Sequence, residues 1–552
     1  MLKNWKAHLT GAALVAMVGA VGCYDFGSAR DKCEAEGRCD ALPDGGRPDG
    51  GGECIPTSTD DPPDDQFIDA NCDGVDGIAT GAIFVDPVSG KDGAAGTMED
   101  PLRTITEALG RVQQGTTPQQ VYLAQGSYNE PDIVLNVPAS LYGAYGGLNN
   151  WQRRAEYTTH VDGGLVGMTV RGLQNDTGIV LERLLVTSAN ATDSGTPSIA
   201  LRIIDSQGVR LRHDILWAGL GAPGTNGGAG ARGADGGMGG DGGSGYFSGV
   251  SAVGGPLGVA GTSMCGATNN NGGSGQQGAT GNNAGEMGVQ GLPVGFGGQG
   301  GQPGAVGTPF TDQFDGKRKC AAGSGGNGGP GTAGGSGTAG GSGAGAGLLQ
   351  NELWVQNQQG GNGGVGDVGG GGGGGGSGGS CPVENSVVGA PGGGSGGGGG
   401  GGCGGTGGQG GGGGGASIAL MLIRSNVSFD GATVLRTRGG GRGGQGGEGG
   451  PGGQGGLGGL GGAGALNTNP TYTTRGGSGG DGGVGGPGGQ GGPGGGGGGG
   501  PSVGVWCGSD AGFTGSAQDQ LSDGGVGGPG GPGGNAGNPG LRALFHNCPT
   551  PP

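Results

Sequence analysis

The residues best suited to acid–base chemistry form one short group: Arg210, Arg212, His213 and Asp214. Carboxylates gathered beside a basic side chain can cleave an acidic polysaccharide. On a strand, however, Arg210, Arg212 and Asp214 alternate to one face, which is the ordinary pattern of a solvated sheet surface. We therefore expect no catalytic residue here, and a plain surface role for His213.

A second group of oxygen-bearing side chains occupies Asp69, Asn71, Asp73 and Asp76. Oxygen ligands at alternate positions followed by glycine match the first half of a calcium loop. The group resembles the metal-binding repeats of thrombospondin type in secreted proteins, but the twelfth position is Thr80 and one copy is present. Two interpretations stay open, namely a calcium site and a plain turn rich in Asp, Asn and Gly.

The N-terminus has the form of an export signal. Residues 1–22 combine a basic start with an apolar run too short to span a bilayer. The residues before Cys23 are Ala20, Val21 and Gly22, which resemble the bacterial lipobox, although the usual first residue is Leu. The resemblance implies that Cys23 receives diacylglycerol and anchors an exported protein in a membrane. The alternative is an ordinary cleaved signal, with Cys23 later joining a disulfide.

Ten cysteines remain when Cys23 is set aside from the eleven. An even number in an oxidising compartment favours disulfides, and Cys33 with Cys39 is a plausible local pair. The other connectivities cannot be deduced from the sequence. Tyr24 replaces the Asp that typically retains lipoproteins at an inner membrane, so the outer membrane or cell surface is favoured.

Composition limits the partners and the size of any core. Of 552 residues 167 are glycine, and the formal net charge is −17. Without a basic stripe, nucleic acid is not an expected partner. Residues 23–80 are rich in Asp, Pro, Gly and Cys, which predicts an acidic tether.

Residues 81–220 carry the normal density of apolar residues, in short β-rich runs separated by Gly, Asn or Asp. Three segments, Phe84 to Gly93, Asp100 to Ile105 and Val121 to Tyr128, resemble the opening of right-handed parallel β-helix proteins of the pectate-lyase-like superfamily. The resemblance implies an all-β, right-handed parallel β-helix. It also makes polysaccharide cleavage an alternative function, because many members are lyases or hydrolases.

An internal repeat extends this prediction into residues 221–552. Ser198 to Ser206 recurs as Ser417 to Ser425. We therefore expect the glycine-rich region to be interrupted by further β-helix rungs, at about residues 345–357, 416–437 and 541–547.

The glycine-rich tracts repeat Gly-Gly-Xaa at intervals of three residues. In an extended helix with about three residues per turn, each Xaa falls on one edge and two edges are bare glycine. Such edges would allow a polyglycine-II-like bundle, with Xaa side chains facing solvent. The alternative is disorder, because glycine loses the most backbone entropy on folding. In composition alone, the tracts resemble glycine-rich surface proteins of the mycobacterial PGRS type.

Together these features predict a non-enzymatic, lipid-anchored structural or adhesion protein of the cell surface. Its expected contacts are a membrane, through the lipid, and carbohydrate of the envelope or matrix. The second hypothesis is an enzyme that cleaves polysaccharide on the β-helix face.

Overall fold

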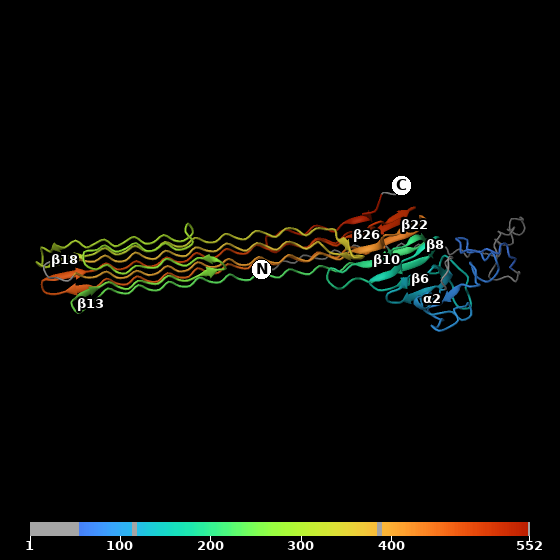
Figure 1. The fold of residues 1–552 in the computed structure, drawn as a ribbon, viewed down its shortest axis with the longest axis horizontal. Helices are drawn as coiled ribbons and strands as arrows, with labels where there is room; N and C mark the ends of the chain where they lie inside the picture. Colours follow the sequence, from blue (N-terminus) through green and yellow to red (C-terminus); the bar gives the residue numbers. More distant parts are fainter. Residues whose placement is uncertain (1–53, 113–118, 383–388, 550–552) are drawn as a thin grey trace, which may run out of the picture. The chain divides into compact units, whose positions relative to one another are not determined.

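The computed structural model describes residues 54–112, 119–382 and 389–549. The chain divides into two units, Met1–Gly77 and Ile78–Pro552. The second unit contains both a stack of strands and a bundle of glycine-rich segments (Figure 1).

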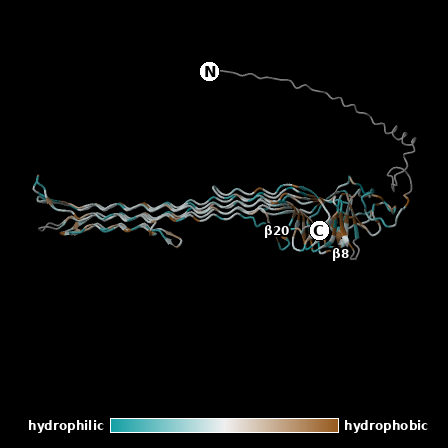
Figure 2. Ribbon diagram, turned by 90° about the horizontal axis from the view of Figure 1, so that it is seen from above, coloured by the Kyte–Doolittle hydropathy of each residue, from teal (hydrophilic) through white to brown (hydrophobic). Residues whose placement is uncertain are grey.

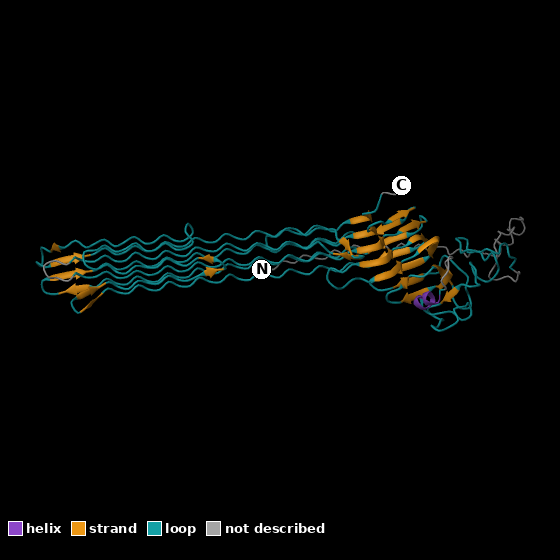
Figure 3. Cartoon of the chain, viewed as in Figure 1, coloured by secondary structure: helices purple, strands orange, loops and turns teal. Residues whose placement is uncertain are grey.

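Three parallel sheets form the stack (Figure 3). Sheet A contains, in pairing order, β1 (Ile83–Val85), β2 (Gln119–Ala124), β5 (Ala139–Tyr145), β8 (Gln174–Glu182), β11 (Gln207–Arg212), β22 (Asn426–Phe429) and β27 (Gly512–Thr514). Sheet B contains β3 (Gly126–Asn129), β6 (Thr159–Asp162), β9 (Leu184–Thr187), β12 (Ile215–Ala218), β23 (Val434–Thr437) and β28 (Gln518–Leu521). Sheet C contains β4 (Val134–Leu135), β7 (Val166–Arg171), β10 (Ser198–Ile204), β21 (Ser417–Ile423), β26 (Ser502–Cys507) and β29 (Arg542–His546). Successive strands visit the sheets in turn, which is the parallel β-helix predicted from the sequence.

The core lies between the three sheets and consists of inward-facing side chains stacked from rung to rung. In sheet C, Met168, Leu201, Leu420 and Val505 occupy one register position and are fully buried. Apolar residues are accordingly concentrated in this part of the unit (Figure 2). Burial of such side chains is the main driving force for stacking the rungs.

Helix α2 (Ile105–Arg111) packs against the first rungs through Ile105 and Leu109. The Thr104 side chain caps it by accepting a hydrogen bond from the Glu107 N–H. The Glu130 carboxylate accepts from the Ile105 N–H at 2.7 Å, so negative charge faces the positive end of the helix.

Two of the three corners turn through one residue of left-handed conformation. Asp205 and Arg424, with φ of 51° and 49°, turn successive rungs from sheet C to sheet A. Arg183 and His213, with φ of 57° and 54°, turn them from sheet A to sheet B. At these turns the chain passes between sheets within one or two residues, whereas residues 146–158 make a longer connection between β5 and β6.

The third corner, from sheet B to sheet C, carries the three glycine-rich excursions. Residues 219–416 follow β12, residues 438–501 follow β23, and residues 522–541 follow β28. Because these excursions leave from consecutive rungs at the same corner, their segments lie side by side as a bundle (Figure 3). Residues 416–437, expected to form a rung, supply β21, β22 and β23, and residues 541–547 contain β29.

Backbone hydrogen bonds between neighbouring segments hold the bundle together. Gly227 and Gly230 donate to the carbonyls of Gln445 and Glu448, both at 2.7 Å, and the pattern repeats every third residue. This is the bonding expected of a polyglycine-II-like bundle. Of the two alternatives for the tracts, the structure therefore shows the ordered one.

Unbroken glycine runs form the enclosed part of the bundle. Gly372, Gly373 and Gly374 donate to three different neighbouring segments, at 2.7, 2.9 and 2.8 Å. A Cβ atom placed on Gly372 would lie 2.0 Å from the carbonyl oxygen of Gly483. Segments with neighbours on every side thus hold glycine and a few buried serines such as Ser377 and Ser395, whereas Gly-Gly-Xaa segments keep one open edge.

Short polar side chains on the open edges complete the bonding. The side chains of Asn226 and Asp241 accept hydrogen bonds from backbone N–H groups of the segment 219 residues later. The same separation of 219 residues joins Asp205 to Arg424 in the β-helix. The register of the rungs therefore continues into the bundle without insertion.

One predicted rung is wrong. Residues 345–357 form an antiparallel hairpin of β19 (Leu348–Gln350) and β20 (Leu353–Val355), which joins none of the three sheets. Trp354 is 4% exposed and packs on the outer face of sheet C against Trp506. The sequence of this hairpin has the apolar pattern of a rung because one face of the hairpin is buried against the outer surface of sheet C.

The far end of the bundle carries further strands. They are the hairpin of β13 (Tyr246–Ser248) and β14 (Ser251–Val253) and the sheet of β17 (Phe310–Thr311), β18 (Arg318–Ala321), β25 (Tyr472–Arg475) and β24 (Leu466–Thr468). We call these strands and the loop 312–317 the distal cap. A shorter hairpin of β15 (Met264–Cys265) and β16 (Thr268–Asn269) ends an inner arm. The expected disulfides are present among the described residues as Cys54–Cys72, Cys265–Cys403, Cys320–Cys381 and Cys507–Cys548.

Candidate functional site

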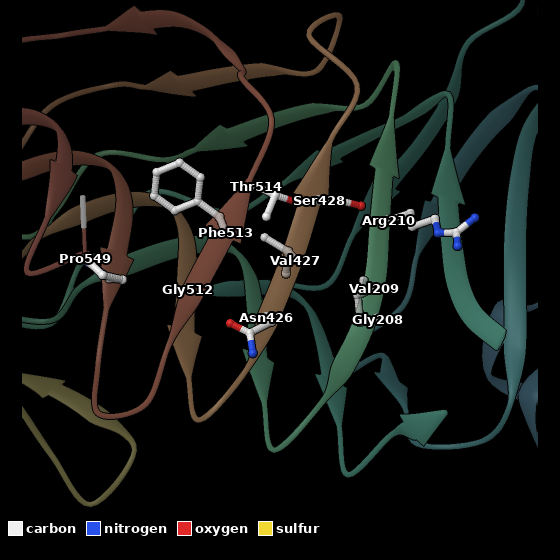
Figure 4. A pocket seen from close by; sticks show the side chains of 10 residues that line it. All are labelled: Gly208, Val209, Arg210, Asn426, Val427, Ser428, Gly512, Phe513, Thr514 and Pro549. Carbon is white, nitrogen blue, oxygen red and sulfur yellow. The ribbon is translucent and has the colours of Figure 1, made fainter. Parts of the chain in front are cut away.

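A shallow cavity of about 320 Å³ lies on the outer face of sheet A (Figure 4). It spans β11, β22 and β27. The register of these strands places small residues next to one another on the outer face, which forms the cavity. Arg210, Ser428 and Thr514 pair in one row and point outward. Glycines at 208 and 512 leave space beside them. The cavity is thus a strip of short polar side chains, and the Arg210 guanidinium extends from its edge over Gly178 of β8 (Figure 4).

The chemistry of this strip is hydrogen bonding. Arg210 offers donors, while Ser428 and Thr514 offer hydroxyl groups that donate and accept. The Asn426 amide at the rim donates to the Gln207 side chain at 2.7 Å. None of the described residues that line the cavity carries a carboxylate, so these residues can hold a polar ligand but supply no acid–base pair.

The group singled out in the sequence does not converge on this cavity. Arg210 lines it, but Arg212 turns to the Glu182 carboxylate at 3.0 Å. Glu182 also binds Arg153 at 2.8 Å, and both of these side chains are fully buried. Paired in this way, the charges fix the rungs to one another.

His213 and Asp214 lie at the adjacent corner. The His213 imidazole lies 3.1 Å from the Asp430 carboxylate. Asp214 is 1% exposed and accepts a hydrogen bond from the Leu184 N–H at 2.9 Å. Burial raises the pKa of the Asp214 carboxyl well above its usual range. Both residues hold the turn between sheets A and B.

Sequence reasoning missed the partners of Arg210. Ser428 and Thr514 come from later rungs, separated from Arg210 by the glycine excursions. The signal available was the repeat of Ser198 to Ser206 at Ser417 to Ser425, because it fixes which following strands become neighbours.

The proposed calcium loop caps its own backbone. Asp69 accepts a hydrogen bond from the Asp73 N–H at 3.1 Å, and the Asn71 side chain accepts from the same group at 2.9 Å. Asp76 accepts from the Asp64 N–H at 3.1 Å. Within the described residues, no three acidic, His or Cys side chains form a group that could hold a metal ion. These hydrogen bonds are those of a turn rich in Asp, Asn and Gly.

The predicted anchor and its neighbours fall outside the described part of the chain. Cys23 and the proposed Cys33–Cys39 pair lie before residue 54. Among the residues that are described, no helix has the length and apolarity to cross a bilayer.

The fold defines a parallel β-helix protein with glycine-rich insertions at one corner. A family described as a protein of unknown function (DUF1565) matches residues 88–142, which contain α2 and the first rungs. No curated protein and no solved structure matches the chain significantly.

Proposed function

We propose that this protein is a non-enzymatic, lipid-anchored surface protein that forms a rigid projection for envelope structure or adhesion. The observation that carries the proposal is the bonding of the glycine bundle. It continues the register of the β-helix, and its enclosed segments bond to neighbours on every side.

The bundle is rigid because many hydrogen bonds together offset the loss of backbone entropy when glycine becomes ordered. Each net hydrogen bond contributes only about 0.5–1.5 kcal/mol, so no single segment could stay ordered alone. Bonding to three neighbours at once makes the segments order together. A projection of fixed length suits a protein that must reach beyond the envelope.

Contact with carbohydrate is proposed for the strip on sheet A. Arg210, Ser428 and Thr514 match the hydroxyl and carboxylate groups of sugars. The described lining residues are hydroxyl, amide, guanidinium and apolar groups, which favours binding over cleavage. Depolymerisation of acidic glycans by the purified chain with calcium, lost in Arg210→Ala, would instead support the enzyme.

Electron microscopy of the purified whole chain tests the projection. We expect straight projections of one uniform length attached to a compact body. A broad distribution of end positions, as flexible tails give, would reject the rigid function.

Labelling with a clickable palmitate analogue tests the anchor. We expect label on the wild-type chain in membranes, and an unlabelled, released chain for Cys23→Ser. A serine variant at Cys54 is the matched control, because it removes another N-terminal cysteine. Equal labelling of the Cys23→Ser chain would reject the anchor.

A further inference from the structure

Aromatic side chains of the bundle are concentrated in the distal cap. The long segments 219–245, 322–347, 438–465 and 476–501 contain no aromatic residue. The cap contains Tyr246, Phe247, Phe310, Phe314 and Tyr472. Since the segments leading to the cap are glycine-rich, this change in composition marks the cap as a separate surface.

The four-stranded sheet of the cap has one open face. Phe310 pairs with Lys319, and Leu466 pairs with Arg475, so the pleat places these side chains on the same side. Phe310 is 56% and Leu466 is 60% exposed. The opposite side contains Cys320, which is buried by its disulfide.

The loop beside this face is braced from within. Lys319 pairs with Asp312 at 2.5 Å and with Asp315 at 3.1 Å. The Asp312 side chain also accepts a hydrogen bond from the Phe314 N–H at 2.8 Å. Phe314 itself is 101% exposed. Because the loop is already held in place, stacking of the exposed Phe314 ring on a ligand requires little further loss of backbone entropy.

The charge of the cap is opposite to that of the chain. Its four basic residues, Lys317, Arg318, Lys319 and Arg475, exceed its two acidic residues, Asp312 and Asp315, whereas the whole chain carries −17. Because Lys319 already holds both carboxylates, Lys317 and Arg475 are the cations that the open face offers to an anion.

We propose that the open face of the distal cap binds an anionic polysaccharide. Phe310 and Phe314 stack on sugar rings, while Lys317 and Arg475 pair with carboxylates along the polymer. This inference rests on the proposed projection, which would carry the cap outward. The open face has few cations, and they lie among aromatic residues. This arrangement fits a polymer with one charge per sugar. The denser phosphates of nucleic acid would require a continuous basic stripe.

Binding of the whole chain to alginate, a polyuronate, tests this proposal, with neutral dextran and single-stranded DNA as comparison probes. We expect salt-sensitive binding to alginate alone. The Phe310→Ala, Phe314→Ala double variant and the Lys317→Ser, Arg475→Ser double variant should each weaken it about tenfold, which corresponds to about 1.4 kcal/mol.

Matched controls lie on the bundle. Leu457, an exposed apolar residue, is changed to Ala, and the exposed Arg442 is changed to Ser. Both controls should bind alginate as the wild-type chain does. No binding to alginate, stronger binding to DNA or dextran, or equal loss in the controls would overturn the inference. Microscopy of the same samples separates this failure from failure of the projection, which would appear as loss of straight rods.

Discussion

The β-helix and the glycine bundle share one register but are stabilised in opposite ways. In the β-helix, inward side chains such as Leu201 and Leu420 fill the space between sheets. In the bundle, the space is too narrow even for a methyl group at Gly372. The first region gains stability from buried apolar area, and the second from backbone hydrogen bonds at close approach.

This difference changes what a sequence must conserve in each region. A rung tolerates exchange among apolar side chains of similar volume. An enclosed segment consists almost entirely of glycine, so its signal is a glycine run such as 396–402 and not a hydrophobic pattern. We therefore expect loss of side-chain volume to destabilise the β-helix and added volume to destabilise the bundle.

The largest effect is expected from Leu420→Ala in the β-helix. Leu420 is fully buried between Leu201 and Val505 of adjacent rungs. The cavity should lower the free energy of unfolding by about 2–5 kcal/mol, measured by denaturant titration. Leu457→Ala, at a bundle position that is 62% exposed, is the control and should change it by less than about 0.5 kcal/mol. Equal effects would contradict the assignment of the core.

Removal of the Cys265–Cys403 disulfide should follow in size. The bond ties an inner hairpin to an enclosed segment of the bundle. Changing both cysteines to Ser should destabilise the attached arm by about 2–4 kcal/mol. Hydrogen exchange should then accelerate in residues 254–279 and not in the β-helix. Acceleration throughout the chain would show that the two regions unfold as one.

A methyl group in the bundle should act next. Gly372→Ala places Cβ 2.0 Å from a neighbouring carbonyl oxygen, so the segments must move apart. We expect a loss of about 3 kcal/mol, the upper end for an inserted methyl group, seen as faster exchange in the surrounding segments.

Gly341→Ala provides the matched control for that substitution. Gly341 also lies in the bundle, but no atom lies within 4 Å of an added Cβ. Its exchange pattern should match that of the wild-type chain. If both variants behave alike, close packing does not hold the bundle.

The sequence predicts the β-helix and the bundle, but it does not predict every element of them. The β-rich runs and the repeat of Ser198 to Ser206 predict the β-helix, and the period of three predicts the bundle. The hairpin at 345–357 was predicted wrongly, because a strand buried from outside carries the same apolar pattern as a rung. The turn at Asn351 and Glu352, both with positive φ, decides between them and leaves no clear sequence signal.

The candidate site was harder to predict than the fold. Arg210 was singled out, but its neighbours Ser428 and Thr514 are ordinary hydroxyl residues in distant segments. Arg212 carries the same charge, yet Glu182 neutralises it in the structure. Spacing along the chain shows which residues share a face, whereas partners across rungs depend on register.

The smallest effect concerns pH. Because burial raises the pKa of Asp214, the folded β-helix keeps a proton that the unfolded chain releases near the ordinary pKa of 3.8. The unfolded state therefore binds fewer protons above this pH, and stability falls as pH rises toward the raised folded pKa. Asp214→Asn removes the titration and keeps an oxygen for the Leu184 N–H. We expect the variant to be more stable than the wild-type chain at neutral pH.

Denaturant titration at several pH values measures this effect, and the bundle supplies the control. Asp241 is exposed and its side chain accepts a hydrogen bond from the Leu460 N–H at 2.7 Å, which an amide oxygen can replace. Asp241→Asn is therefore the matched control, and its stability should follow that of the wild-type chain at each pH. A loss of stability in Asp214→Asn that grows as pH rises would mean that the corner needs an ionised carboxylate, and it would overturn the raised pKa of Asp214.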